Sequence, residues 1–512
     1  MTTAQICIMV SIVAYMAVVI IIGAIYSKKN KNVDDFYLGG RKLGPLVTAM
    51  SAEASDMSSW LLMGLPGLAY LTGVADVGWT AIGLAVGTYI NWLVVAKRLR
   101  NYSANIGAIT IPEFFSLRYK EDKKILMGIA AAVIIVFFVP YTASGFAACG
   151  KLFGTLFGVD YHLAMVISAI VIVGYTSLGG FSAASTTDLV QSIVMTVALI
   201  IVLVFGISQA GGWSAVVNNA SSLPGYLSMT STHDAVNMAS KPYSVFTICS
   251  TLAWGLGYFG MPHILLRFMA IENPKNLKTS RRVASVWVVI SMFVAILIGV
   301  VGLGMVNNTG ALQSLGTESG QTETIIVRIA DLMSQNGVGF ALVAGVILAG
   351  ILASTMSTSD SQLLAASSSA SENILGGVFK LKLSETAKMV VARAVLIVIA
   401  VIGVVLAWDS NSSVFKIVSF AWAGFGASFG PVMLLALFWK RSNKYGAIAG
   451  MLAGGIMVFV WKYVIAGLHP MLAIYELLPA FIFGLAVNVV VSLVTKKPED
   501  SIAEEFDAAK AM

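Results

Sequence analysis

The stretch that decides the fold is Ser51-Ala52-Glu53-Ala54-Ser55-Asp56-Met57-Ser58-Ser59, which interrupts an otherwise apolar run at residues 44–72. A second apolar run, residues 242–268, is interrupted by Trp254-Gly255-Leu256-Gly257-Tyr258-Phe259-Gly260-Met261-Pro262. Each run is long enough to cross a bilayer, so the sequence predicts two membrane helices that are broken in the middle. Free backbone groups persist at that depth only where they line a cavity. Two such breaks at matching places in two halves of a chain are typical of a secondary transporter's binding site.

The composition is that of a protein built mainly from membrane-spanning helices. Hydrophobic residues make up 58% of the 512 residues and charged residues 11%, against about 45–50% and about 25% in soluble domains. We expect about thirteen spans, each of about 20 apolar residues. They lie at residues 5–26, 44–72, 75–96, 125–149, 160–178, 183–208, 242–268, 284–306, 336–360, 386–408, 413–438, 445–467 and 471–495.

Lysine and arginine are distributed unevenly between the two ends of these spans. All but five of the 32 Lys and Arg residues fall on one side, which the positive-inside rule makes cytoplasmic. The sequence therefore predicts an N-terminus outside and a C-terminus inside. Because the net charge of +7 comes from these loops, it does not indicate nucleic-acid binding. The five exceptions are Lys151, Lys241, Arg328, Lys416 and Lys462.

The two breaks divide the chain into repeats. Spans 2–6 and 7–11 are predicted to form two five-helix units of opposite topology. The expected organisation is an extra N-terminal helix with a basic loop (1–43), the first repeat (44–208), an outer loop (209–241), the second repeat (242–438), two extra C-terminal helices (439–495) and a short cytoplasmic tail (496–512). Such a tail is too short for a soluble catalytic or signalling domain. No nucleophile–base pair or metal constellation is visible, so we do not expect an enzyme.

Ionisable residues inside membrane spans are expensive and therefore functional candidates. Four carboxylates of the predicted spans are the candidates, namely Glu53, Asp56, Asp188 and Asp360. Asp56 lies inside the first break, where its carboxylate either attracts a cation or caps the second half-helix. Three basic residues lie near helix ends and are expected to snorkel to the membrane surface: Arg267, Lys416 and Lys462.

Hydroxyl groups crowd the cytoplasmic half of the ninth span, at Ser354, Thr355, Ser357, Thr358, Ser359 and Ser361. Sodium is a hard cation that prefers several oxygen ligands, and a hydroxyl-rich helix facing the first break would supply them. The alternative is that these hydroxyls bond to their own or neighbouring helices.

Three aromatic residues point to a pocket at the second break. Trp254 and Tyr258 are four residues apart, and Tyr141 lies on the fourth span. Their rings would suit a small organic cation or zwitterion through cation–π contacts. Aromatic packing without a ligand is the competing interpretation.

Several motifs resemble those of the sodium/solute symporter family, most of all its bacterial sodium/proline symporters. They are Ser51 to Gly67, Gly179 to Gln191, Trp254 to His263, Ile351 to Leu364 and Ala421 to Val432, in consistent order along nearly the whole chain. The resemblance implies an all-α leucine-transporter-type fold, a five-plus-five inverted repeat with one extra N-terminal and two extra C-terminal helices. It also implies sodium-coupled uptake of L-proline by alternating access in a bacterial inner membrane, by a monomer, with sodium as coupling ion and no organic cofactor.

The resemblance further implies which residues form each site. Sodium would meet the backbone carbonyls of Ala54, Met57 and Ser354 and the hydroxyls of Ser357 and Thr358, with Asp56 nearby. Asp188 matches a family aspartate near a sodium exit route or second sodium site. The substrate site would draw on Ser58, Ser59, Tyr141, Trp254, Tyr258 and Pro262.

Four residues depart from the proline symporters. Glu53 and Ser59 stand where glycine is usual, Met261 where glutamine is usual, and Asp360 where a small hydroxyl residue is usual. Ser59 and Met261 would reshape the pocket for another small zwitterion or a carboxylate. Asp360 with Asp188 and Ser361 would form a second cation site, or one carboxyl would stay protonated and allow proton coupling. Glu53 would pair with a polar neighbour in the core. A membrane sensor without transport is a remote alternative.

Overall fold

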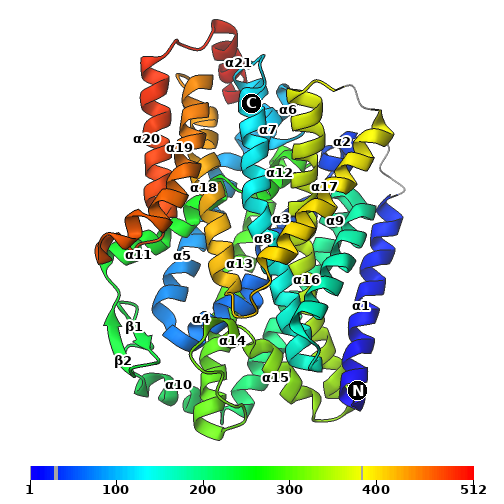
Figure 1. The fold of residues 1–512 in the computed structure, drawn as a ribbon, viewed down its shortest axis with the longest axis vertical. Helices are drawn as coiled ribbons and strands as arrows, with labels where there is room; N and C mark the ends of the chain where they lie inside the picture. The colour runs from blue at the N-terminus through cyan, green and yellow to red at the C-terminus, as the bar shows by residue number, and fades with distance from the viewer. Residues whose placement is uncertain (1, 28–32, 382–383, 512) are drawn as a thin grey trace.

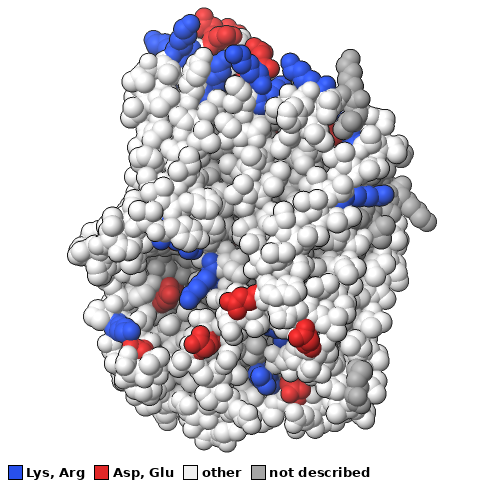
Figure 2. Space-filling model, in the orientation of Figure 1, with Lys and Arg blue, Asp and Glu red and all other residues white. Residues whose placement is uncertain are grey.

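The computed structural model describes residues 2–27, 33–381 and 384–511 and is almost entirely helical. Residues 28–32, which belong to the segment predicted as a basic loop, and residues 382–383 lie outside the described residues. Most long helices run along the long axis of the molecule, with the N-terminus and C-terminus near opposite ends (Figure 1). Lys and Arg gather at the C-terminal end, and a broad band of the visible face carries few charges (Figure 2).

Within the described residues, ten helices are long and apolar enough to cross a membrane, and three shorter apolar helices cover Trp60–Thr72, Tyr161–Gly174 and Val245–Phe259. These three fall within the predicted spans 44–72, 160–178 and 242–268. The long elements are α1 (Thr3–Ser27), α5 (Val74–Ile90) continuing into α6 (Ala96–Asn105), α8 (Ile125–Phe157), α9 (Tyr161–Gln209), α13 (Leu277–Gly304), α16 (Val338–Ser368), α17 (Glu385–Leu406), α18 (Val414–Phe438), α19 (Lys444–Tyr463) and α20 (Leu477–Val494).

Element α9 is two helices joined end to end. Within it, Gly180 adopts a φ of 68° and a ψ of −179°. This backbone conformation is unfavourable for any residue that carries a side chain. The kink separates the predicted spans 160–178 and 183–208.

Both predicted helix breaks are present. The first run consists of α3 (Pro45–Asp56), a π-helical turn η2 (Trp60–Gly64) and α4 (Leu65–Thr72). The second consists of α11 (Val245–Leu252), a 3-10 turn η4 (Ala253–Phe259) and α12 (Pro262–Ala270). Pro262 occupies the first turn of α12, where its missing N–H is not needed.

The ninth predicted span is longer than expected. Helix α16 continues through the π-helical residues Ser369–Val378, and Ser367 to Ser369 and Ser371 are buried. Their hydroxyls bond mostly to carbonyls one turn earlier, and Ser371 also pairs with Tyr37. Protein therefore surrounds this serine-rich extension.

Short elements close the two ends of the bundle. They are α2 (Val33–Leu38), α7 (Ile111–Arg118), α10 (Trp213–Ser222), an antiparallel hairpin of β1 (Ser231–Asp234) and β2 (Ala239–Pro242), α14 (Ser319–Thr322), α15 (Ile325–Ser334) and α21 (Asp500–Ala511). The predicted tail thus contains a helix. Its Phe506 ring lies 4.8 Å from the guanidinium carbon of Arg98 and 5.1 Å from that of Arg118, so α21 is anchored by cation–π contacts.

Small residues allow the broken helices to pack closely against their neighbours. A Cβ atom added at Gly83 or Gly87 of α5 would overlap the backbone of Leu252 or Gly255 at the second break. Gly299 of α13 is equally close to the carbonyl of Pro66 beyond the first break. Close approach through small residues is a common way to pack membrane helices.

We expect Gly87→Val to destabilise the protein, because its side chain would displace the backbone at the second break by overpacking, at a cost of about 1–3 kcal/mol or more. Gly339→Val is the control, since a Cβ there meets nothing within 4 Å. The measurement is the melting temperature of each purified variant. Equal melting temperatures for the two variants would contradict the predicted role of this crossing.

Candidate functional site at the two helix breaks

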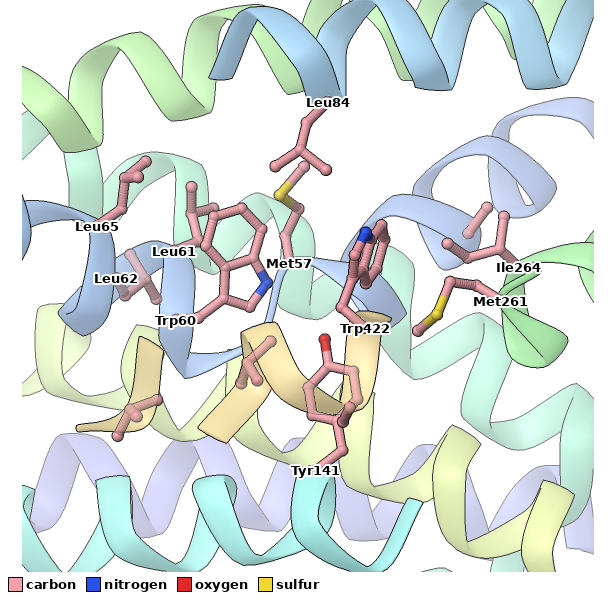
Figure 3. Packing of buried hydrophobic residues seen from close by; sticks show 14 of the residues in the cluster. Met57, Trp60, Leu61, Leu62, Leu65, Leu84, Tyr141, Met261, Ile264 and Trp422 are labelled. Atoms are coloured by element: carbon pink, nitrogen blue, oxygen red, sulfur yellow. The ribbon is translucent and has the colours of Figure 1, made fainter. Parts of the chain in front are cut away.

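The first break is held by hydrogen bonds to one backbone carbonyl. The carbonyl oxygen of Asp56 accepts from the N–H of Ser58 at 2.8 Å, from Trp60 Nε1 at 2.9 Å and from Tyr141 Oη at 3.1 Å. Tyr141 reaches this position from α8, with its hydroxyl directed toward the first break (Figure 3). These donors replace the helical partner that the interruption removes.

A side-chain hydrogen bond connects the two breaks directly. Tyr258 Oη, from η4, donates to Asp56 Oδ2 at 2.7 Å. The Asp56 carboxylate is fully buried, and its Oδ1 has no hydrogen-bond partner among the described residues. The carboxylate therefore does not cap η2, whose start at Ser59 receives no side-chain bond. A buried carboxylate with one bare oxygen is a place that attracts a cation.

The proposed sodium ligands cluster between α3 and α16. Ser357 Oγ lies 2.7 Å from the Ala54 carbonyl oxygen and 3.2 Å from that of Ser354. Thr358 Oγ1 lies 3.1 Å from the same Ser354 oxygen. All four groups are buried, and Met57 directly follows the end of α3. This set of neutral oxygens suits a hard monovalent cation, although the hydroxyls also bond back to their own helix.

The expectation that Arg267 snorkels to the membrane surface is wrong. Arg267 is 1% exposed, because α12 runs through the interior of the bundle. Its Nη2 lies 3.2 Å from Asp188 Oδ2 and donates to Ser361 Oγ at 2.6 Å, while its Nε donates to Ser51 Oγ at 3.0 Å. Ser51 in turn donates to Asp188 Oδ2 at 2.6 Å. A buried guanidinium thus joins α3, α9, α12 and α16.

The residues predicted for a second cation site lie around this guanidinium. Asp188 and Ser361 both contact Arg267. Asp360 interacts electrostatically with Arg267 and accepts a bond from Thr176 Oγ1 at 2.6 Å. Glu53 accepts from Trp92 Nε1 at 3.0 Å, which gives it a polar neighbour in the core. Little in the sequence indicates that Arg267 is buried, because hydropathy cannot distinguish a buried helix end from an exposed one.

Aromatic rings surround the second break. Trp254 stacks on Trp60 with centroids 6.2 Å apart and on Tyr475 at 5.0 Å. Phe415 lies 5.3 Å from Trp254, and Trp422 donates its Nε1 to the Trp254 carbonyl at 2.8 Å. Sequence reasoning named Trp254, Tyr258 and Tyr141 but missed Trp60, Phe415, Trp422 and Tyr475. Trp60 and Trp422 stood within the quoted motifs, which was the available signal.

The remaining substrate candidates divide into two groups. Ser58 and Ser59 lie between α3 and η2, and the Ser59 hydroxyl is buried without a hydrogen-bond partner in the described part of the chain. Met261 directly precedes α12, which begins at Pro262, and Pro262 lines a small pocket with Phe181 and Arg267. Figure 3 places Met261 on the far side of Trp422 from Trp60. Pro262 therefore belongs to the Arg267 network more than to the aromatic cluster.

A second buried ion pair joins α8 to the residues between α14 and α15. Lys151 Nζ lies 2.8 Å from Glu323 Oε2, and both side chains are almost fully buried. Glu323 also accepts from the N–H groups of Val414 and Phe415 at the start of α18. Because Phe415 packs on Trp254, this ion pair is connected to the aromatic cluster.

Comparison with known proteins adds to this geometry. A family model described as the sodium:solute symporter family matches residues 36–454. The chain belongs to this family. The sodium/proline symporter of Haemophilus influenzae is 40% identical over 506 residues, covering 98% of this chain and 97% of the relative. The high-affinity proline transporter PutP of Bacillus subtilis is 40% identical over 489 residues, covering 95% and 98%.

Solved structures of similar shape are transporters of the leucine-transporter fold. A Na+-coupled sialic acid symporter in a substrate-bound, outward-open state superposes with a TM-score of 0.78, at 18% identity and over 96% of this chain and 99% of that chain. Mhp1, a nucleobase-cation-symport-1 family transporter, gives a TM-score of 0.55 at 14% identity, over 93% and 99%. This symporter-family chain therefore has the leucine-transporter-type fold.

We expect Tyr258→Phe to change the rise in melting temperature that sodium produces, because the substitution removes the donor to Asp56 Oδ2. The loss of such a bond to a buried group costs about 1–3 kcal/mol. The control is Tyr226→Phe, which removes a buried hydroxyl bond to the Ala69 carbonyl outside the site. The measurement is the rise in melting temperature on adding sodium chloride instead of choline chloride. If both variants keep the wild-type rise, the link between the breaks has no bearing on sodium.

Proposed function

We propose that the protein is a secondary active transporter that couples the uptake of L-proline to sodium by alternating access. The observation that carries this proposal is the Tyr258–Asp56 hydrogen bond between the two helix breaks, next to the oxygen cluster at Ala54 and Ser357. Relatives named as sodium/proline symporters and proline transporters, each covering nearly the whole chain, support the choice of ion and substrate.

Sodium would bind where α3 meets α16. Its ligands would be the carbonyls of Ala54, Met57 and Ser354 and the hydroxyls of Ser357 and Thr358. Bound there, the ion would replace the Ser357–Ala54 hydrogen bond and fix the end of α3. Sodium then favours the form of the break that binds substrate, and this difference in affinity between two states is the coupling.

The substrate would lie between the breaks. Its carboxylate would meet free N–H groups near Ser58 and Ser59, where the second half-helix begins and its dipole favours an anion. Its ring and ammonium would face Tyr141, Trp254 and Tyr258, whose ring faces attract a cation. Met261 and Pro262 would bound the cytoplasmic side of the site.

The two buried ion pairs would act as alternate closures. Lys151–Glu323 would separate when the site opens outward, and Arg267–Asp188 when it opens inward. Breaking a buried pair exposes both charges to water, which compensates for the lost contact. With Ser361 and Asp360, the inner pair would also offer a second cation site once Arg267 moves away. The protein would work as a monomer in the bacterial inner membrane, with its C-terminus in the cytoplasm.

Two features favour a second candidate function, also a transport function. Ser59 and Met261 would alter the polar lining of the pocket, so another small zwitterion or a carboxylate is the alternative substrate. Asp360, hydrogen-bonded to Thr176 near Arg267, makes protons the alternative coupling ion.

Uptake by the purified protein in liposomes tests these possibilities. Labelled L-proline is supplied with an inward sodium gradient or with choline, each with and without a proton gradient. We expect uptake only with sodium. Uptake driven by a proton gradient alone would show that protons, and not sodium, are the coupling ion. No uptake by folded protein would exclude proline, and unlabelled amino acids and betaines would then be screened by their sodium-dependent stabilisation of the protein.

We expect Ser357→Ala to raise the sodium concentration for half-maximal uptake by roughly tenfold, equivalent to about 1.4 kcal/mol, because one oxygen ligand is lost. Ser354→Ala is the matched control, since Ser354 would bind through its carbonyl and its hydroxyl bonds only to Ile351 among the described residues. Sodium activation curves are measured at saturating proline. Identical curves for the two variants would remove the Ser357 hydroxyl from the site.

A further inference from the structure

A large apolar groove lies outside the transport site, between α9 and α13. Its volume is about 490 Å³. Thr196, Leu199 and Ile200 line one wall, and residues of α13 between Arg282 and Val294 line the other. Met50, on α3, completes the lining.

The groove opens toward the hydrocarbon of the membrane. The residues on both sides of its mouth are large, apolar and exposed, as at Ile193 and Val197 of α9 and at Val289 and Phe293 of α13. Its few polar groups are satisfied within the protein. Trp287 Nε1 donates to Thr196 Oγ1 at 2.8 Å, and Ser291 Oγ donates to the Val288 carbonyl at 3.2 Å. A molecule bound between these walls therefore contacts an apolar surface whose polar groups already have hydrogen-bond partners.

The length of the groove matches one leaflet. From Arg282 to Val294 a helix rises about 18 Å, at about 1.5 Å per residue. Half of a hydrocarbon core of about 30 Å is about 15 Å. A groove of this length, beginning at the cytoplasmic end of α13 in the orientation that the charge distribution gives, has room for an acyl chain of the inner leaflet.

A positive charge marks the cytoplasmic end of the groove. Arg282 lines the groove there and is exposed, and no described carboxylate forms an ion pair with it. Lys278 and Arg281 lie within the same turn of α13. The guanidinium carbon of Arg281 lies 5.1 Å from the centre of the Tyr89 ring, in a cation–π contact. Basic pockets between membrane helices at the cytoplasmic surface are suited to anionic lipid headgroups.

We propose that this groove binds an anionic phospholipid of the inner leaflet, with one acyl chain between α9 and α13 and its phosphate on Arg282. The site is independent of the solute that is carried. It nevertheless touches the moving parts, since Met50 precedes Ser51, which bonds to Asp188 and Arg267. A bound lipid packs against the half-helix that holds the inner ion pair in place.

The test compares phosphatidylglycerol with phosphatidylcholine of the same acyl chains, added to delipidated protein in detergent. Bound lipid is counted by native mass spectrometry, and the melting temperature is followed. Arg282→Gln removes the proposed phosphate contact. Lys278→Gln is the matched control, because it removes an equal charge from the same helix without lining the groove. Val286→Trp fills the groove from its exposed side.

We expect the wild type and Lys278→Gln to bind phosphatidylglycerol about fivefold more tightly than phosphatidylcholine, the effect of one basic residue near the surface. Arg282→Gln loses this preference, and Val286→Trp retains one lipid fewer. Equal binding of the two lipids by the wild type would overturn the proposal. So would an equal loss of preference in Arg282→Gln and Lys278→Gln, which would indicate a diffuse positive surface.

Discussion

Backbone hydrogen bonding is interrupted at Met57 and again near Gly260, where both residues are buried in the bundle. Backbone groups released there need partners within the protein or on a ligand, since an unsatisfied group costs several kcal/mol in hydrocarbon. The Asp56 carbonyl shows the solution, because three donors converge on it, namely one backbone N–H and the side chains of Trp60 and Tyr141. The positions of Trp60 and Tyr141 are consequences of that need.

The same constraint explains the buried charges. Asp188 and Glu323 each have a basic partner and at least one further hydrogen bond, as buried charges require. Asp56 is different, because a tyrosine hydroxyl is its hydrogen-bond donor and no basic side chain pairs with it in the described part of the chain. The two ion pairs hold helices together, whereas the buried Asp56 carboxylate has no basic partner among the described residues and would attract a cation.

The breaks were predictable because glycine, proline and serine within an apolar run conflict with a continuous helix. The hydroxyl pattern indicated that the ninth span faces the first break, and the family resemblance implied that Ser357 and Ala54 belong to one site; the two residues are in contact. The burial of Arg267 was not predictable, since it depends on how α12 tilts into the bundle. Phe415 and Tyr475 reach Trp254 from distant parts of the chain, and an aromatic residue in an apolar run gives no sign of its neighbour. The separation of Pro262 from the rings likewise follows from the turn of the chain at Gly260.

The hydrogen bond from Ser357 to the Ala54 carbonyl has a consequence for the sodium site proposed there. An ion that bound these oxygens would first have to displace this bond, and the loss of one such bond is worth about 1 kcal/mol, or about a fivefold weaker affinity. Without the ion, the same bond satisfies the Ala54 carbonyl, so that the two helices do not face each other with unpaired oxygens. A site of this kind would bind its ion less tightly and would leave a fully bonded contact between α3 and α16 when the ion is released.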